Sequence, residues 1–240
     1  MTFLLPARRR LFLLLVLLFA LVALFPLRLA FNMLELQDKG LAARAINGGV
    51  WWGNIEQLRL GRVMLGDVEA RVSPIQLLVG RARMDFVRQT GASDDLKGAV
   101  TVSNASFGID DVTASIGADG LLAPLPVSGV DFSDVSVRFT DGACVRAQGR
   151  IKARMAAAIQ GLNLSQGLSG EAVCDGPALF LPLVSQSGLE KFNLHIEADG
   201  TYRAELLVST TDAALAATLA GNGFSRGAGG GYVLKINGNL

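Results

Sequence analysis

The sequence is poor in the residues that build catalytic and metal sites. Its 240 residues include a single histidine, His195, and two cysteines that stand far apart. A zinc site favours several nitrogen and sulfur ligands at local spacing, and these three residues do not offer that arrangement. We therefore predict neither a metal site nor a cofactor.

One pattern has a catalytic precedent, and it is incomplete. Residues 223–227 read GFSRG and match the G-x-S-x-G turn of α/β-hydrolases, which needs a strand before the serine, a helix after it and a later histidine. Ser225 is instead followed by a run of glycines, and His195 precedes it. These glycines also lack the strand–turn–helix setting of a phosphate-binding loop. We predict no enzyme activity.

An excess of charge of one sign is also lacking. The chain has 22 Lys and Arg against 21 Asp and Glu, a net charge of +1, and no basic run follows residue 10. Nucleic-acid binding depends on clustered positive charge that neutralises phosphates. The sequence therefore predicts no nucleic-acid partner.

What the sequence does have is one long apolar segment near its start. Residues 11–27 carry no charge and would form a helix of about 26 Å, close to the roughly 30 Å of a bilayer core. Arginines fill positions 8–10, whereas Arg28 alone follows closely, and positive charge favours the cytoplasmic side. A cleaved signal peptide fits less well, because cleavage after Ala30 would put Arg28 where a small residue is needed.

Four segments follow from this reading. We predict a cytoplasmic tail over residues 1–10, a transmembrane anchor over 11–28, a helical stalk over 29–40 and an extracytoplasmic β domain over 41–240. The two cysteines, Cys144 and Cys174, then lie in an oxidising compartment, where a pair is most simply a disulfide. Closing that loop would stabilise the fold by about 3.5 kcal/mol. Two buried free thiols are the alternative.

After residue 40 the period of the apolar residues changes to two. Val68, Ala70 and Val72 alternate with polar residues, and similar alternation recurs over residues 82–86, 100–103, 134–139 and 145–152. One-sided alternation is typical of antiparallel strands with one solvated face. The chain thus predicts an all-β fold, in which a single N-terminal transmembrane helix precedes a strongly curved antiparallel β-sheet of ten or more strands.

One hairpin can be predicted down to its register. A two-residue turn at Asp199 and Gly200 would put the apolar residues of its two strands on opposite faces. A three-residue loop over 198–200 pairs Ile196 with Tyr202 and places Gly200 where a left-handed residue is needed. We predict the three-residue loop.

Two further segments depart from the alternating pattern. Ser73, Pro74 and Gln76 form a capping box with proline at the first helical position, and Gly80 ends the segment. We expect this short helix over residues 73–79, with the loops, to cover part of the apolar face. Residues 221–231 are rich in glycine, and we expect a flexible loop there before a last strand from residue 232.

Several landmarks together resemble a known family. GVWWG at 49–53 and SPIQLLVGR at 73–81 resemble the pattern G-x-W-x-G … P-x-x-L-L-x-G near the start of the type II secretion system protein N family (general secretion pathway protein N). LLAPLPV at 121–127, the two cysteines and DGTY at 199–202 resemble its later sections. Ala70 departs from the pattern, because the family often has an aromatic residue there.

The resemblance implies an inner-membrane accessory component of the type II secretion system, supporting export of folded periplasmic proteins across the outer membrane. Its expected location is the cell inner membrane, as a single-pass protein with the N-terminus cytoplasmic and most of the chain periplasmic. Expected partners are inner-membrane platform subunits of the secretion system, reached through the anchor or an exposed strand edge, together with membrane lipid around the anchor. A homo-oligomer remains open. AsmA-like proteins share parts of these motifs, so a periplasmic lipid-binding or lipid-transfer module with a β groove is the alternative.

Trp51 and Trp52, the two tryptophans of the chain, are the candidate partner surface. We expect them on a first strand, one packed on the apolar face and the other at a rim where a partner subunit binds. A position at the membrane interface, which tryptophan favours, and a stacking platform for a sugar or nucleotide are the alternatives.

Overall fold

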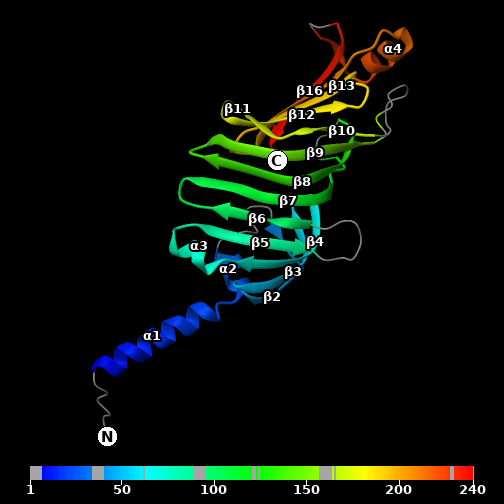
Figure 1. Cartoon of the computed structure of the whole chain (residues 1–240). Coiled ribbons are helices and arrows are strands. Elements are labelled where there is room, and N and C mark those ends of the chain that lie inside the picture. The colour runs from blue at the N-terminus through cyan, green and yellow to red at the C-terminus, as the bar shows by residue number, and fades with distance from the viewer. Residues whose placement is uncertain are drawn as a thin grey trace.

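The structure is a computed structural model that describes residues 7–33, 41–61, 63–88, 96–120, 123, 125–156, 164, 166–227 and 230–239. These residues form one open antiparallel sheet of 16 strands, with helices at the start, at one end of the sheet and near the C-terminus (Figure 1). The strands lie in the sheet nearly in chain order. Neighbours in the chain are therefore mostly neighbours in the sheet, as short hairpin connections allow.

The elements have the following bounds in the described residues. The helices are α1 (Ala7–Ala23), α2 (Leu27–Met33), α3 (Pro74–Leu78) and α4 (Ala213–Gly221). The strands are β1 (Leu41–Ala42), β2 (Ala45–Gly49), β3 (Trp52–Leu60), β4 (Val63–Val72), β5 (Ala82–Arg88), β6 (Leu96–Val102), β7 (Ser106–Gly117), β8 (Val127–Thr140), β9 (Ala143–Met155), β10 (Leu168–Glu171), β11 (Val173–Asp175), β12 (Ala178–Ser185), β13 (Glu190–Ile196), β14 (Thr201–Val208), β15 (Ser225–Arg226) and β16 (Tyr232–Asn239). The prediction of a mainly β, antiparallel chain is confirmed.

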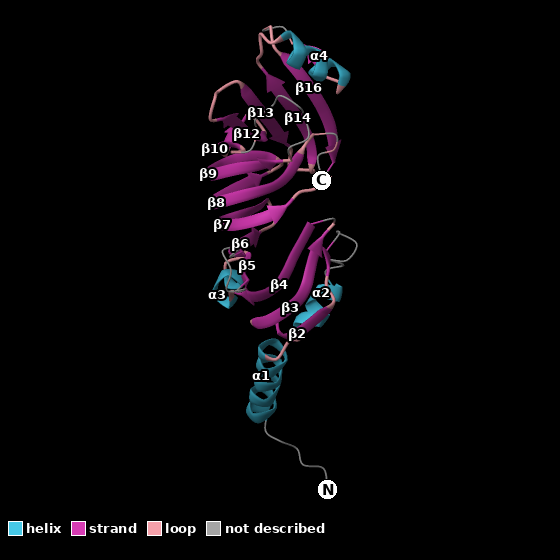
Figure 2. Cartoon of the chain, turned by 90° about the vertical axis from the view of Figure 1, so that its right-hand side faces the viewer, coloured by secondary structure: helices cyan, strands magenta, loops and turns pink. Residues whose placement is uncertain are grey.

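The strands curve around an inner apolar face (Figure 2). Alternation sets this face, as in β4, where Val68 and Ala70 are buried while Asp67 and Arg71 are exposed. Two clusters of buried side chains result, a larger one centred on β8–β14 and a smaller one on β3–β7. In the larger cluster Phe192, Leu168 and Leu206 are almost fully buried, and residues such as Phe132 are partly buried around them.

The predicted hairpin has the expected register. Ile196 pairs with Tyr202, and the pairing continues along β13 and β14 to Glu190 opposite Val208. Gly200 has φ +87°, a left-handed conformation that glycine adopts without a Cβ penalty. The three-residue loop is therefore confirmed.

One apolar residue of the alternating pattern lies on the wrong face. Val145 was expected beside Ile151 on the apolar side of its strand, but it is 58% exposed. The register between β8 and β9 shifts there, because Arg138 pairs with Arg146 while Phe139 pairs with Cys144. Val145 is the extra residue of a β-bulge, and a bulge turns one side chain out of the alternation.

The predictions for the short helices need correction. α3 begins after Ser73 with proline in its first turn, but the Ser73 side chain makes no capping hydrogen bond. None of its residues is buried, and Leu78 is 88% exposed, so α3 does not cover the apolar face. α4, which was not predicted, begins at Asp212, whose side chain accepts a hydrogen bond from the Ala214 N–H. Part of the expected loop over 221–231 forms strand β15.

The N-terminal segment is divided in two. Among the described residues, no helix is both long enough and apolar enough to cross a membrane. The single spanning helix predicted over 11–28 is therefore not supported. Pro26 has no N–H to continue a helix and separates α1 from α2. The predicted stalk over 29–40 includes the end of α2, and residues 34–40 lie outside the described part.

Candidate functional site

The feature that best accounts for the quoted motifs is a junction between the N-terminal helices and the first hairpin. We define the junction as residues 22–27 and 49–53. The Trp51 indole N–H donates to the carbonyl of Val22 at the end of α1 (2.9 Å), and the Val50 N–H donates to the carbonyl of Phe25 (2.9 Å). The junction thus ties two carbonyl groups to the sheet: that of Val22 in the last turn of α1 and that of Phe25 just beyond it.

Glycine is required at the junction for steric reasons. A Cβ at Gly53 would overlap the Leu27 side chain and would lie 2.9 Å from the backbone oxygen of Asn47. Leu27 and Phe31 of α2 are 6% and 4% exposed, so α2 buries its apolar stripe in this place. The tryptophan–glycine motif therefore has a packing cause: the glycine admits α2 onto the hairpin.

The two tryptophans have different surroundings. Trp51 lies in the turn between β2 and β3 and is half-buried, while Trp52 begins β3 and is 66% exposed. The guanidinium carbon of Arg71 lies 4.5 Å from the centroid of the Trp52 ring, a cation–π contact, and Arg71 also pairs with Glu69 (3.3 Å). A shallow hollow of about 230 Å³ lies beside the exposed ring. The expectation that both tryptophans lie on a strand holds for Trp52 alone.

No pattern in the sequence analysis indicated that α2 or Arg71 belongs with the tryptophans. The signal that was available is the spacing of Leu27 and Phe31, which stand four residues apart on one helix face. The contact between Trp51 and Val22 spans 29 residues and leaves no local pattern in the sequence. The role of Trp51 and Trp52 as a partner surface stays a prediction.

The predicted disulfide is confirmed. Cys144 of β9 is bonded to Cys174 of β11, with their Cα atoms 5.6 Å apart. β11 pairs with β12 and not with β9, so the bond joins two parts of the sheet that no strand pairing connects directly. It holds β11, which lies in the connection between β10 and β12, against the hairpin of β8 and β9.

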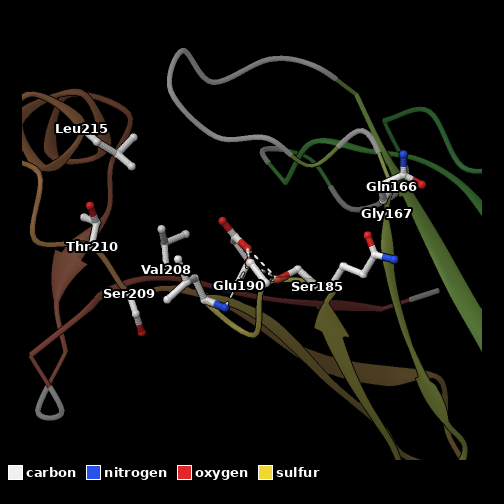
Figure 3. A pocket seen from close by; sticks show the side chains of 11 residues that line it. Gln166, Gly167, Ser185, Glu190, Val208, Ser209, Thr210 and Leu215 are labelled. Carbon is white, nitrogen blue, oxygen red and sulfur yellow. Dashed lines mark hydrogen bonds between the residues drawn. The ribbon is translucent and has the colours of Figure 1, made fainter.

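A hollow of about 370 Å³ lies near the hairpin of β12 and β13, and Figure 3 shows the side chains that line it. Glu190 is 8% exposed there, and the hydroxyl groups of Ser185 and Ser187 both donate to its carboxylate, the latter at 2.7 Å. These bonds close the turn that joins the two strands. The arrangement satisfies a buried carboxylate and supports the hairpin, as buried polar groups require.

The residues of the incomplete catalytic pattern lie in ordinary strand positions. Ser225 lies on β15, where its hydroxyl donates to the carbonyl of Val233 on β16 (3.3 Å), and not at a strand-to-helix turn. His195 lies opposite Arg203, stacks on Phe180 with ring centroids 4.3 Å apart, and has its Nε2 3.1 Å from the Asp175 carboxylate. Both side chains serve contacts within the sheet.

Comparison with known proteins agrees with the motifs that meet at the junction. The family described as "Type II secretion system (T2SS), protein N" matches residues 39–235, which include nearly the whole sheet. The type II secretion system protein N of Vibrio cholerae is 27% identical over 204 residues, covering 79% of this chain and 80% of that protein. No solved structure matches the chain. The chain belongs to the type II secretion system protein N family.

Proposed function

We propose that this chain is an inner-membrane accessory component of the type II secretion system, which holds an open β-sheet in the periplasm and supports export of folded proteins across the outer membrane. The observation that carries the proposal is the family match over residues 39–235, because it runs through the sheet from its first strands to its last. A protein of this kind acts through what it binds. The proposal therefore concerns an anchor and a contact surface.

The anchor is α1. Twelve large apolar residues between Leu11 and Leu24 are 47–78% exposed. Keeping this much apolar surface in water costs on the order of 10 kcal/mol, which a bilayer would remove. The arginines at positions 8 and 9 precede these residues, and positive charge favours the cytoplasmic side, so the sheet would lie in the periplasm. The disulfide supports the same compartment, since disulfides persist where the environment is oxidising.

The contact surface that we propose for the platform subunits is the outer edge of β16. β16 pairs with β14 along its full length, from Tyr232 to Asn239. On its other side, β15 pairs only with Tyr232 and Val233 among the described residues. The remaining backbone N–H and C=O groups of that edge are available to a strand from another subunit, a recognised mode of binding.

The alternative, an AsmA-like lipid-transfer module, has less support. A lipid groove would expose apolar side chains along the concave side of the sheet. In the larger cluster Leu168 and Leu206 are fully buried and fill this space at their positions, whereas Phe132 and others of the cluster are partly buried. A photoactivatable lipid tests this alternative, because it would label inner-face residues if the sheet bound lipid.

The proposed function is tested by deleting the gene in the producing bacterium and measuring where the exported proteins accumulate. We expect folded exoproteins to remain in the periplasm, and the wild-type gene to restore their release. A gene encoding Leu14→Arg and Leu17→Arg in α1 should fail to restore it, whereas Leu14→Ile with Leu17→Ile should succeed. Normal release in the deletion strain would contradict the proposal.

A further inference from the structure

α3 and the residue that follows it form an apolar projection. Ile75, Leu77, Leu78 and Val79 are 73%, 43%, 88% and 66% exposed. A helix on a globular domain normally turns its apolar stripe towards the core, and α3 buries none of its residues. We name residues 74–79 the α3 projection.

The projection is held firmly in this position. The N–H of Ser73 donates to the carbonyl of Arg83 (3.0 Å), and the N–H of Arg81 donates to the carbonyl of Gln76 (2.9 Å). The first bond ties the start of the segment to β5, and the second closes the turn between α3 and β5. The exposure of its apolar residues is therefore a property of the fold.

The projection lies at the same end of the sheet as the end of α1. The Val50 N–H donates to Phe25 beyond α1, and the Val50 carbonyl accepts from the Val72 N–H (3.3 Å), two residues before α3. Two hydrogen bonds at Val50 thus link the residues just after α1 to the end of β4, which leads into α3. Figures 1 and 2 both show α3 at the end of the sheet from which α1 leaves.

Aromatic and basic residues accompany the projection. Trp52 is 66% exposed at the start of β3, and Arg71 of β4, the strand that leads into α3, lies over its ring. Arg81 is exposed directly after Gly80. Tryptophan favours the headgroup level of a bilayer, and arginine places its charge among lipid phosphates while its stem stays in apolar surroundings. The composition is that of a surface in contact with lipid headgroups.

We infer that the α3 projection and Trp52 rest in the headgroup region of the bilayer that α1 enters. The inference rests on the proposed anchoring by α1 and adds a second attachment to it. One helix leaves the sheet free to tilt and rotate above the membrane. A second contact beside it fixes which strands face the periplasm and keeps the β16 edge turned away from the lipid.

Lipid is a better occupant than a protein partner for this surface. Leu78 is 88% exposed and so projects from the fold, whereas helix or strand recognition uses a groove or a long edge. A bilayer needs no complementary shape, and the proposed anchoring by α1 would bring it to this end of the sheet. Contact with a partner subunit is the outcome that the test must separate.

The test uses the full chain in vesicles of phosphatidylethanolamine with a minority of phosphatidylglycerol. Single cysteines, Leu78→Cys, Leu189→Cys and Leu17→Cys, carry an environment-sensitive fluorophore, and lipids with a nitroxide in the headgroup or the acyl chain quench it. The native disulfide leaves no other free thiol. Leu189 is the matched control, because it is 52% exposed in the hairpin of β12 and β13, far along the sheet from α1.

We expect the label at Leu78 to emit at shorter wavelength than the label at Leu189 and to lose most of its emission to the headgroup nitroxide. Quenching at Leu17 but not at Leu78 would overturn the inference and leave the anchor in place, with a protein partner as the remaining occupant of the projection. Equal quenching at Leu78 and Leu189 would also overturn it. If Leu17 is not quenched by the acyl-chain nitroxide, the proposed anchor itself fails.

Discussion

Replacing Gly53 with alanine should loosen α2 from the sheet. The added Cβ would overlap the side chain of Leu27 and would lie 2.9 Å from the backbone oxygen of Asn47 and 3.1 Å from that of Gly49. The two backbone oxygens move only if the hairpin moves. Overpacking of this kind costs about 1–3 kcal/mol, and expelling Leu27, which is 6% exposed, would cost about 1.5–3 kcal/mol. We therefore expect the free energy of unfolding to fall by about 1–3 kcal/mol.

The two tryptophans provide the assay, since both lie at the junction. Unfolding of the detergent-solubilised chain by urea should be followed by tryptophan fluorescence and by far-ultraviolet circular dichroism. In Gly53→Ala the fluorescence transition should move to lower urea and precede the loss of strand signal. Gly117→Ala is the matched control, because Gly117 is also in a strand and its added Cβ meets nothing within 4 Å. Equal stability of the two variants would refute the steric account of the motif.

Three further predictions concern the sheet. Replacing both disulfide cysteines with serine should lower the free energy of unfolding by about 3.5 kcal/mol, and a loss under about 1 kcal/mol in denaturant titration would contradict the loop-closure argument. Asp110→Ala removes the partner of two arginines and a threonine and should lower the free energy of unfolding by about 1–3 kcal/mol. Asp119→Ala, at an exposed turn, should lower it little. Equal losses in the two variants would contradict the prediction. The N–H of Thr201 lowers the pKa of the Asp199 carboxyl below its ordinary value of 3.8, so this contribution to stability is present above that value and is lost as the pH falls through the lowered pKa. The stability difference between wild type and Asp199→Ala should therefore shrink below pH 3.8, and a difference independent of pH would argue against the bond.

Features that depend on neighbouring residues could be predicted from the sequence. The register of the hairpin over 192–206 follows from alternation and one turn, because a slip of one residue would turn every apolar side chain outward. The disulfide was predicted from two cysteines that the sequence analysis placed in an oxidising compartment. The left-handed Gly200 was predictable for the same local reason.

Features that depend on distant partners could not be predicted. Val145 left the alternation because the opposite strand shifts its register, which no pattern within β9 reveals. Leu78 is 88% exposed although it belongs to an apolar run, and the Trp51–Val22 contact spans 29 residues. The pattern of Ser73, Pro74 and Gln76 with Gly80 indicated a helix correctly but did not show which surface the helix would face.

The central claim, that this sheet assembles with the inner-membrane part of the secretion system, is tested most directly by crosslinking in the producing bacterium. A photo-crosslinking amino acid at Asn237, on the open edge of β16, should yield an adduct with a platform subunit of that system. Gln148, exposed on β9, is the control position and should yield none. Failure of Asn237 to capture any subunit of the secretion system, with the protein present at its normal level, would contradict the account.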